Sequence, residues 1–126
     1  MSDWIPFEDA TYQVEQAFVV AANKDAVVLE QTLVTVYTGK GGKKYLSGTG
    51  LISNILLVEL LEESDDLDMI LDLGGEYKYF LKTPKMSAGK VFSPDIKSSL
   101  QFSPTTPWQQ IPKPDFDVLI SRLKLL

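Results

Sequence analysis

Residues 27–53 read VVLEQTLVTVYTGKGGKKYLSGTGLIS, two strand-like runs separated by a turn rich in glycine and lysine. The first run, Val27 to Tyr37, is rich in valine and threonine, whose β-branched side chains fit a pleated surface. The glycines of TGKGGKK can adopt the positive φ angles of a tight turn. The second run, Tyr45 to Leu51, returns from that turn, so we predict an antiparallel hairpin.

The segment that follows, residues 51–73, fits two structures. The leucine and glutamate content of ILLVELLEES favours a helix, whereas a continuous apolar run fits a buried strand equally well. The ESDD cluster at 63–66 predicts a turn, and LDMILDL at 67–73 predicts a further short element. EYKYFLK at 76–82 then alternates as a strand does and ends before a proline.

The N-terminal region also fits two structures. Apolar residues between positions 14 and 21 lie at helical spacing, with Asp9 as a possible N-cap and Asn23 as a stop signal. The alternative is a strand, because apolar side chains also share one strand face over residues 12–20, interrupted by Gln16. We expect the helix.

Residues 93–114 contain five prolines, which predict an extended segment that runs across the domain and does not lie centrally in a sheet. The sequence DFDVLISRLKLL at 115–126 predicts an amphipathic helix, because its apolar residues fall on one stripe. Two aspartates at its start and Arg122 and Lys124 near its end suit the helix dipole.

Together these elements predict one α+β domain over residues 1–126. We expect a compact, mostly antiparallel sheet or small barrel with a C-terminal amphipathic helix and a possible N-terminal helix. A chain of 126 residues is long enough to bury a core without a disulfide or a metal.

The chain contains no histidine and no cysteine, and Arg122 is its only arginine. It therefore lacks the side chains that most often transfer protons, attack substrates or bind zinc near neutral pH. We expect no enzyme and no cofactor, and we assign no catalytic, cofactor-binding or metal-binding residue.

Three motifs invite a functional interpretation and have a simpler structural one. The glycines and lysines from Gly39 to Lys44 suggest a phosphate-binding loop, but no serine or threonine follows the lysine pair, so we predict a hairpin turn. The triplet GTG at 48–50 is expected to be a turn or a bulge. The acidic cluster at 59–68 lacks the spacing of a calcium-binding loop, so a solvated face is expected and cation binding is the alternative.

A hydrolase that uses only carboxylates is a further alternative, because paired acids cleave glycosides without histidine. It requires a hollow flanked by two carboxylates within about 10 Å of each other. The sequence places no two of its seventeen acidic residues in such an arrangement.

The net charge of −5 disfavours nucleic acid and anionic membrane surfaces as partners. Acidic residues dominate positions 59–76 and lysines dominate positions 78–97, which predicts pairing across a turn. The longest nearly apolar run extends from Leu51 to Leu61 and is too short to span a bilayer, which requires about 20 apolar residues. With no signal-peptide pattern and no cysteine, a cytoplasmic location is expected.

These features favour a non-catalytic function in protein association, as a subunit of a homo-oligomer or of a larger complex. Trp4 and Trp108 each lie close to prolines, either buried with the indole N–H bonded or exposed as anchors for a partner. The helix stripe either packs on its own sheet or enters a groove of another subunit. The candidate partner-binding residues are Trp108, Phe116, Leu119, Ile120 and Leu123.

The strand EQTLVTVY, the glycine and lysine turn, YLSGTGLIS and the final amphipathic helix together resemble pleckstrin-homology and GRAM-type domains. The resemblance covers about a quarter of the chain and implies, as an alternative function, an adaptor that binds a peptide or a lipid headgroup. Lipid-binding members of that family carry a basic pocket with arginine. Here the same region offers Lys40, Lys43 and Lys44 beside an acidic segment.

Overall fold

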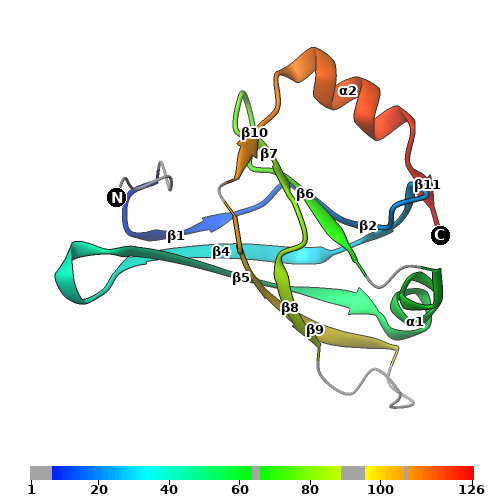
Figure 1. Ribbon diagram of the computed structural model, residues 1–126, viewed down its shortest axis with the longest axis horizontal. Helices are drawn as coiled ribbons and strands as arrows, with labels where there is room; N and C mark the ends of the chain where they lie inside the picture. Colours follow the sequence, from blue (N-terminus) through cyan, green and yellow to red (C-terminus); the bar gives the residue numbers. More distant parts are fainter. Residues whose placement is uncertain (1–6, 64–65, 89–95, 107) are drawn as a thin grey trace.

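Residues 7–63, 66–88, 96–106 and 108–126, which the computed structural model describes, form two β-sheets and two α-helices (Figure 1). Sheet A has the strand order β1 (Ala10–Gln13), β4 (Glu30–Thr38), β5 (Lys44–Ser53), β9 (Lys97–Ser103) and β8 (Lys85–Ala88). Sheet B has the order β10 (Gln109–Gln110), β7 (Lys78–Leu81), β6 (Asp68–Asp72), β2 (Gln16–Val20), β3 (Asp25–Val28) and β11 (Lys124–Leu125). The helical segments are the short 3₁₀ turn η1 (Lys40–Gly42), helix α1 (Asn54–Glu63) and helix α2 (Lys113–Ser121).

The predicted α+β class with mostly antiparallel sheets is confirmed, since β11 and β3 form the one parallel pair among the described strands. The alternative of a small barrel is wrong, because neither sheet closes on itself within the described residues. The predicted C-terminal helix is present as α2.

One bent hairpin belongs to both sheets. β1 leads into β2 and β3 leads into β4, while β1 pairs with β4 in sheet A and β2 pairs with β3 in sheet B. Two backbone hydrogen bonds bridge the bend, from Val14 N–H to the Thr32 carbonyl (3.0 Å) and from Leu29 N–H to the Ala17 carbonyl (2.9 Å). Gln31 has a φ of 50° where the β4–β5 register shifts, as at a bulge that bends a strand. The first run of the predicted hairpin is therefore two strands.

The helix expected over residues 14–21 is wrong, because these residues form the bend and strand β2. β2 is covered on both faces: Ala17 and Val19 belong to the core between the sheets, and Phe18 and Val20 belong to a second cluster with α2. A strand buried on both sides loses its polar alternation. Its apolar residues then also fall at helical spacing, which explains the error.

Residues 51–73 contain both a helix and a strand. The leucine- and glutamate-rich half is α1, as its helix propensities favour. The LDMILDL half contains β6, whose Met69 and Leu71 belong to the core between the sheets, while Ile70 belongs to the cluster with α2. The strand predicted in EYKYFLK is confirmed as β7.

The proline-rich segment was expected to stay out of the middle of a sheet, and this expectation is wrong for residues 97–103. These residues form β9, which lies between β5 and β8 in sheet A. The prolines flank β9 and leave all its backbone N–H groups available for pairing. The density of prolines around the strand concealed it.

The triplet GTG at 48–50 is not a turn, because it lies within β5, and the register shift with β4 falls opposite Gly50. A Cβ atom on Gly48 would lie 2.0 Å from the ring of Phe102, and one on Gly50 would lie 2.6 Å from the side chain of Leu29. Both positions are glycine because large core side chains occupy the space beside the backbone. The contact of Gly48 with Phe102 joins β5 to β9, and the contact of Gly50 with Leu29 joins β5 to the bent hairpin.

Helix α2 packs on the side of sheet B that faces away from sheet A, through buried Phe116. The helix ends at Ser121, earlier than the predicted stripe, which extended to residue 126. The remaining residues form β11, which pairs with β3. Sheet B is therefore covered on both faces, by sheet A and by α2 (Figure 1).

Gly48→Ala is expected to lower the free energy of unfolding by about 1–3 kcal/mol, because the added methyl group overlaps the ring of Phe102. Phe102→Leu also destabilises the protein through lost buried surface, but it removes that overlap. The double variant should therefore lose less than the sum of the two single variants in urea denaturation followed by circular dichroism. Strictly additive losses would contradict this packing.

Candidate functional site

The five predicted partner-binding residues all make contacts within the chain. Trp108 is 9% exposed in the core between the sheets, and its indole N–H has no acceptor among the described residues. Phe116 is buried on sheet B, with Leu119, Ile120 and Leu123 half-buried around it. The apolar stripe of α2 therefore packs on the chain's own sheet, as one of the two alternatives predicted. A role of these residues in partner binding stays a prediction. Trp4 lies outside the described residues.

A buried ion pair lies beneath the start of α2. The Lys78 ammonium is 3.2 Å from an Asp72 carboxylate oxygen, donates to the Gly75 carbonyl at 2.5 Å, and lies 5.2 Å from the centre of the Phe116 ring. The same Asp72 oxygen accepts the backbone N–H of Gly74 at 2.9 Å. The pair crosses the β6–β7 turn, as the neighbouring acidic and basic segments predicted. The contacts described for the pair are all with residues of the same chain, which supports a structural role.

The outward side chains of sheet A form a continuous exposed surface, here called the outer face. A single row of paired residues crosses all five strands: Gln13, Leu33, Thr49, Gln101 and Ser87. The neighbouring residues on this face are Thr11, Thr35, Ser47, Ser99, Ser103 and Lys85. The Thr11 and Thr35 hydroxyl oxygens are 3.1 Å apart, and those of Thr49 and Ser99 are 3.3 Å apart.

The outer face continues onto the end of the β4–β5 hairpin, which extends beyond the rest of the molecule (Figure 1). Tyr37 and Tyr45 stack there with ring centres 5.3 Å apart, and the Lys43 ammonium lies 5.4 Å from the centre of the Tyr45 ring. Asp9, predicted as a helix N-cap, instead accepts hydrogen bonds from the backbone N–H and the hydroxyl of Thr38. The predicted hairpin turn is confirmed, with positive φ at its two central glycines.

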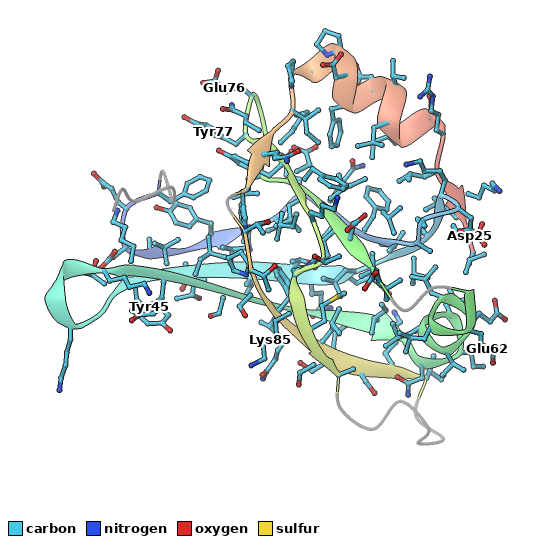
Figure 2. The ribbon with its side chains drawn as sticks, viewed as in Figure 1. Asp25, Tyr45, Glu62, Glu76, Tyr77 and Lys85 are labelled. Carbon is cyan, nitrogen blue, oxygen red and sulfur yellow. The ribbon has the colours of Figure 1, made fainter. Side chains whose placement is uncertain are left out.

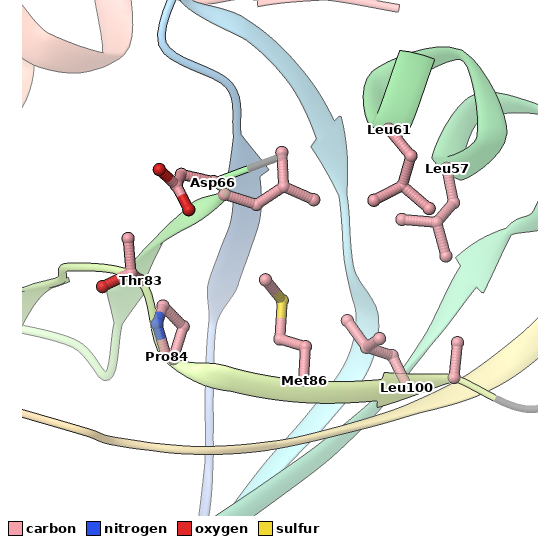
Figure 3. Close-up of a pocket in the computed structure, with 9 residues that line it drawn as sticks. Leu57, Leu61, Asp66, Thr83, Pro84, Met86 and Leu100 are labelled. Carbon is pink, nitrogen blue, oxygen red and sulfur yellow. The ribbon is translucent and has the colours of Figure 1, made fainter. Parts of the chain in front are cut away.

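Three hollows formed by the described residues bear on these alternatives. One, of about 430 Å³, lies on the outer face between Leu33 and Lys85. A second, of about 330 Å³, lies between α1 and β8 and is mainly apolar, with Leu57, Leu61 and Met86 in its wall (Figure 3). The third, of about 340 Å³, is lined by aromatic side chains next to β1. None of the three is lined by two carboxylates, which the hydrolase alternative requires.

The acidic segment is divided among separate elements. Helix α1 exposes Glu59 and Glu62 beside Ile55, which is 73% exposed, and Leu61. Asp68 accepts the backbone N–H of Thr83 at 2.8 Å and thus has a structural role. Within the described part of the chain, no group of three acidic side chains is arranged to hold a metal ion.

Tyr45, at the end of the hairpin, and Glu62, on α1, lie toward opposite ends of the molecule (Figure 2).

Among the described residues, two ionisable side chains have clearly shifted pKa values. Burial raises the pKa of the Tyr79 phenol, and the nearby Tyr77 and Glu76 raise it further. A hydrogen bond to Asp117 raises the pKa of Lys113 on the exposed side of α2. Near neutral pH both groups keep the protonation state that they have in water, a neutral phenol and a charged ammonium.

Alternation along the two strands of the hairpin is the sequence signal for the outer face. In EQTLVTVY and YLSGTGLIS, hydroxyl and aromatic side chains alternate with apolar or glycine positions. Such alternation marks a strand with one buried and one exposed face. Reading it on both strands of the hairpin identifies Leu33, Thr35 and Tyr37 opposite Thr49, Ser47 and Tyr45.

Comparison of the chain with protein-family models, with curated proteins and with solved structures found no match. The similarity to pleckstrin-homology and GRAM-type domains therefore rests on the quoted segments alone. Within the residues that the structure describes, neither helix has the length and apolar character needed to traverse a bilayer.

Phe116→Ala is expected to lower the free energy of unfolding by about 3–5 kcal/mol, because it removes the buried ring that joins α2 to sheet B. Val118→Ala on the same helix is the matched control, since Val118 is 49% exposed and should change stability little. Chemical denaturation measures both. Equal losses for the two variants would contradict the packing of α2 described here.

Proposed function

We propose that the protein is a non-catalytic assembly subunit that binds a second copy of itself through the outer face of sheet A. The observation that carries this proposal is an exposed five-stranded surface that ends in a stacked tyrosine pair. Tyr37 is 47% exposed and Tyr45 is 39% exposed, although both rings are large and mainly apolar. Tyrosine is among the residues that most often dominate binding energy at protein interfaces.

The chemistry of the outer face suits association. Most of its side chains are serine, threonine or glutamine, and serine and threonine have few rotamers to lose when a partner covers them. Backbone geometry already fixes their positions in the paired rows of the sheet. A partner would therefore meet a preorganised surface with many hydrogen-bonding groups.

Charge supports a second copy as the partner. The outer face and its hairpin carry lysines, with Lys97 paired to Glu30 at the margin, whereas the whole chain has a net charge of −5. The exposed side of α1 offers the complement, acidic Glu59 and Glu62 beside apolar Ile55. Opposite charges on two surfaces attract when copies meet.

The geometry suits a head-to-tail contact. The hairpin end and α1 lie toward opposite ends of the molecule, so one copy can use both surfaces at once (Figure 1). Contacts between two different surfaces of identical chains produce rings or open filaments. We therefore expect assemblies larger than a dimer at sufficient concentration.

Two double variants test this arrangement. The hairpin variant carries Lys43→Glu and Tyr45→Ser, and the α1 variant carries Ile55→Ser and Glu62→Lys, so each blocks one of the two surfaces. Light scattering is expected to show concentration-dependent growth of the wild-type protein. Each variant should associate at least ~30-fold more weakly, which corresponds to about 2 kcal/mol for the loss of a central aromatic or apolar contact. A mixture of the two variants should form dimers that do not grow, because each keeps one intact surface.

Val118→Ser on α2 is the control and should assemble as the wild type does. A wild-type protein that remains a single chain at every concentration would contradict self-assembly. Hairpin-dependent binding to acidic lipid vesicles, without self-association, would favour the adaptor alternative instead. If the mixture of the two variants forms assemblies larger than dimers, surfaces other than the hairpin and α1 are responsible for the association.

A further inference from the structure

A hollow of about 340 Å³ lies between β1 and the turn that joins β6 to β7. Its lining residues are Phe7, Glu8, Tyr12, Gln13, Leu73 and Tyr77. Three of these six side chains are aromatic and one is a carboxylate. The hollow adjoins the edge of the outer face at Gln13, and the inference drawn from it does not rest on the proposed assembly.

The aromatic rings form tilted walls around this hollow. The ring centres of Phe7 and Tyr12 are 5.3 Å apart with an angle of 48° between the planes, and those of Phe7 and Tyr77 are 6.2 Å apart at 56°. Because the rings are not parallel, their faces point in different directions. Tyr77 is 48% exposed, so one wall of the hollow opens to solvent.

The surrounding structure holds these rings in place. The Tyr12 hydroxyl donates to the Glu8 carbonyl at 2.6 Å, which fixes the direction of its ring. Tyr77 exchanges backbone hydrogen bonds with the turn, donating to Gly74 at 2.9 Å and accepting from Leu73 at 2.8 Å. Phe7 also contacts the ring of Tyr79, with centres 5.6 Å apart. The rings therefore need little rearrangement to receive a ligand.

The charges around the hollow are mainly negative. Glu8 lines it directly, Glu76 precedes Tyr77 in the turn, and the Glu15 carboxylate lies against Gly74 of the same turn. Two ammonium groups lie close by: Lys44 donates to the Phe7 carbonyl at 2.6 Å, and Lys78 donates to the Gly75 carbonyl of the turn at 2.5 Å. Lys78 is paired with a fourth carboxylate, Asp72, so the described charges of this region keep a negative balance.

From this geometry we propose that the aromatic hollow binds a methylated ammonium group. Aromatic faces attract cations, and a quaternary ammonium combines a positive charge with an apolar methyl surface that fits against rings and Leu73. Glu8 adds the attraction of a full negative charge. A bare ammonium is more strongly hydrated and loses more on entering such a site.

Choline is the probe, and 3,3-dimethylbutan-1-ol is its neutral isostere with the same shape. In ligand-observed NMR titrations, choline is expected to bind at least tenfold more tightly than the isostere. Tyr77→Leu should reduce choline binding at least tenfold, whereas Tyr77→Phe should retain it because the ring face remains. Glu8→Gln should weaken binding severalfold.

The control is Val118→Ser, which changes an exposed side chain on α2 and should leave choline binding unchanged. Equal affinity for choline and its isostere, equal losses in Tyr77→Leu and Val118→Ser, or no binding at millimolar choline would each overturn the proposal. Amide spectra of the variants verify that the fold is intact, which is expected because Tyr77 is half-exposed.

A second titration distinguishes the sources of this chemistry, a free small cation or a modified lysine in a protein. It compares choline with a short peptide containing trimethyllysine and with the same peptide containing unmodified lysine. Preference for choline assigns the site to a small molecule, and preference for the trimethylated peptide assigns it to a protein. Equal binding of the two peptides would contradict recognition of methyl groups.

Discussion

The bend between β1–β2 and β3–β4 is the constraint on which the architecture depends. Because the same two chain segments pair in both sheets, the sheets cannot be separated without breaking that hairpin. The bulge at Gln31 and the hydrogen bond from Val14 to Thr32 set the angle at which sheet A meets sheet B. The core between the sheets, the aromatic hollow and the exposed outer face all follow from that angle.

The two sheets are covered differently, and this difference separates structural from candidate functional residues. Sheet B has α2 on one side and sheet A on the other, so its strands are apolar on both faces. Sheet A has one side in the core and carries hydroxyls, amides and tyrosines on the other. The helix stripe around Phe116 therefore stabilises the fold, whereas the side chains of the outer face remain exposed.

The sequence predicted what depends on local spacing and missed what depends on distant partners. The central hairpin and α2 were predictable, since valine and threonine content, turn glycines and an apolar stripe are local signals. The role of Gly48 was not, because Phe102, which occupies its space, lies in another part of the chain. β2 was mistaken for a helix because burial on both faces removes alternation. The outer face was readable from alternation within the hairpin, but its extension to Gln101 required the pairing of β9 with β5.

The position of β9 also bears on how quickly the protein reaches its native state. The β4–β5 hairpin closes across a short turn, so it can form early and at low entropic cost. β9 must then return from much later in the chain to dock beside β5, and such long loop closures slow folding. Before β9 docks, the edge of β5 has unpaired backbone groups, and unpaired strand edges favour aggregation.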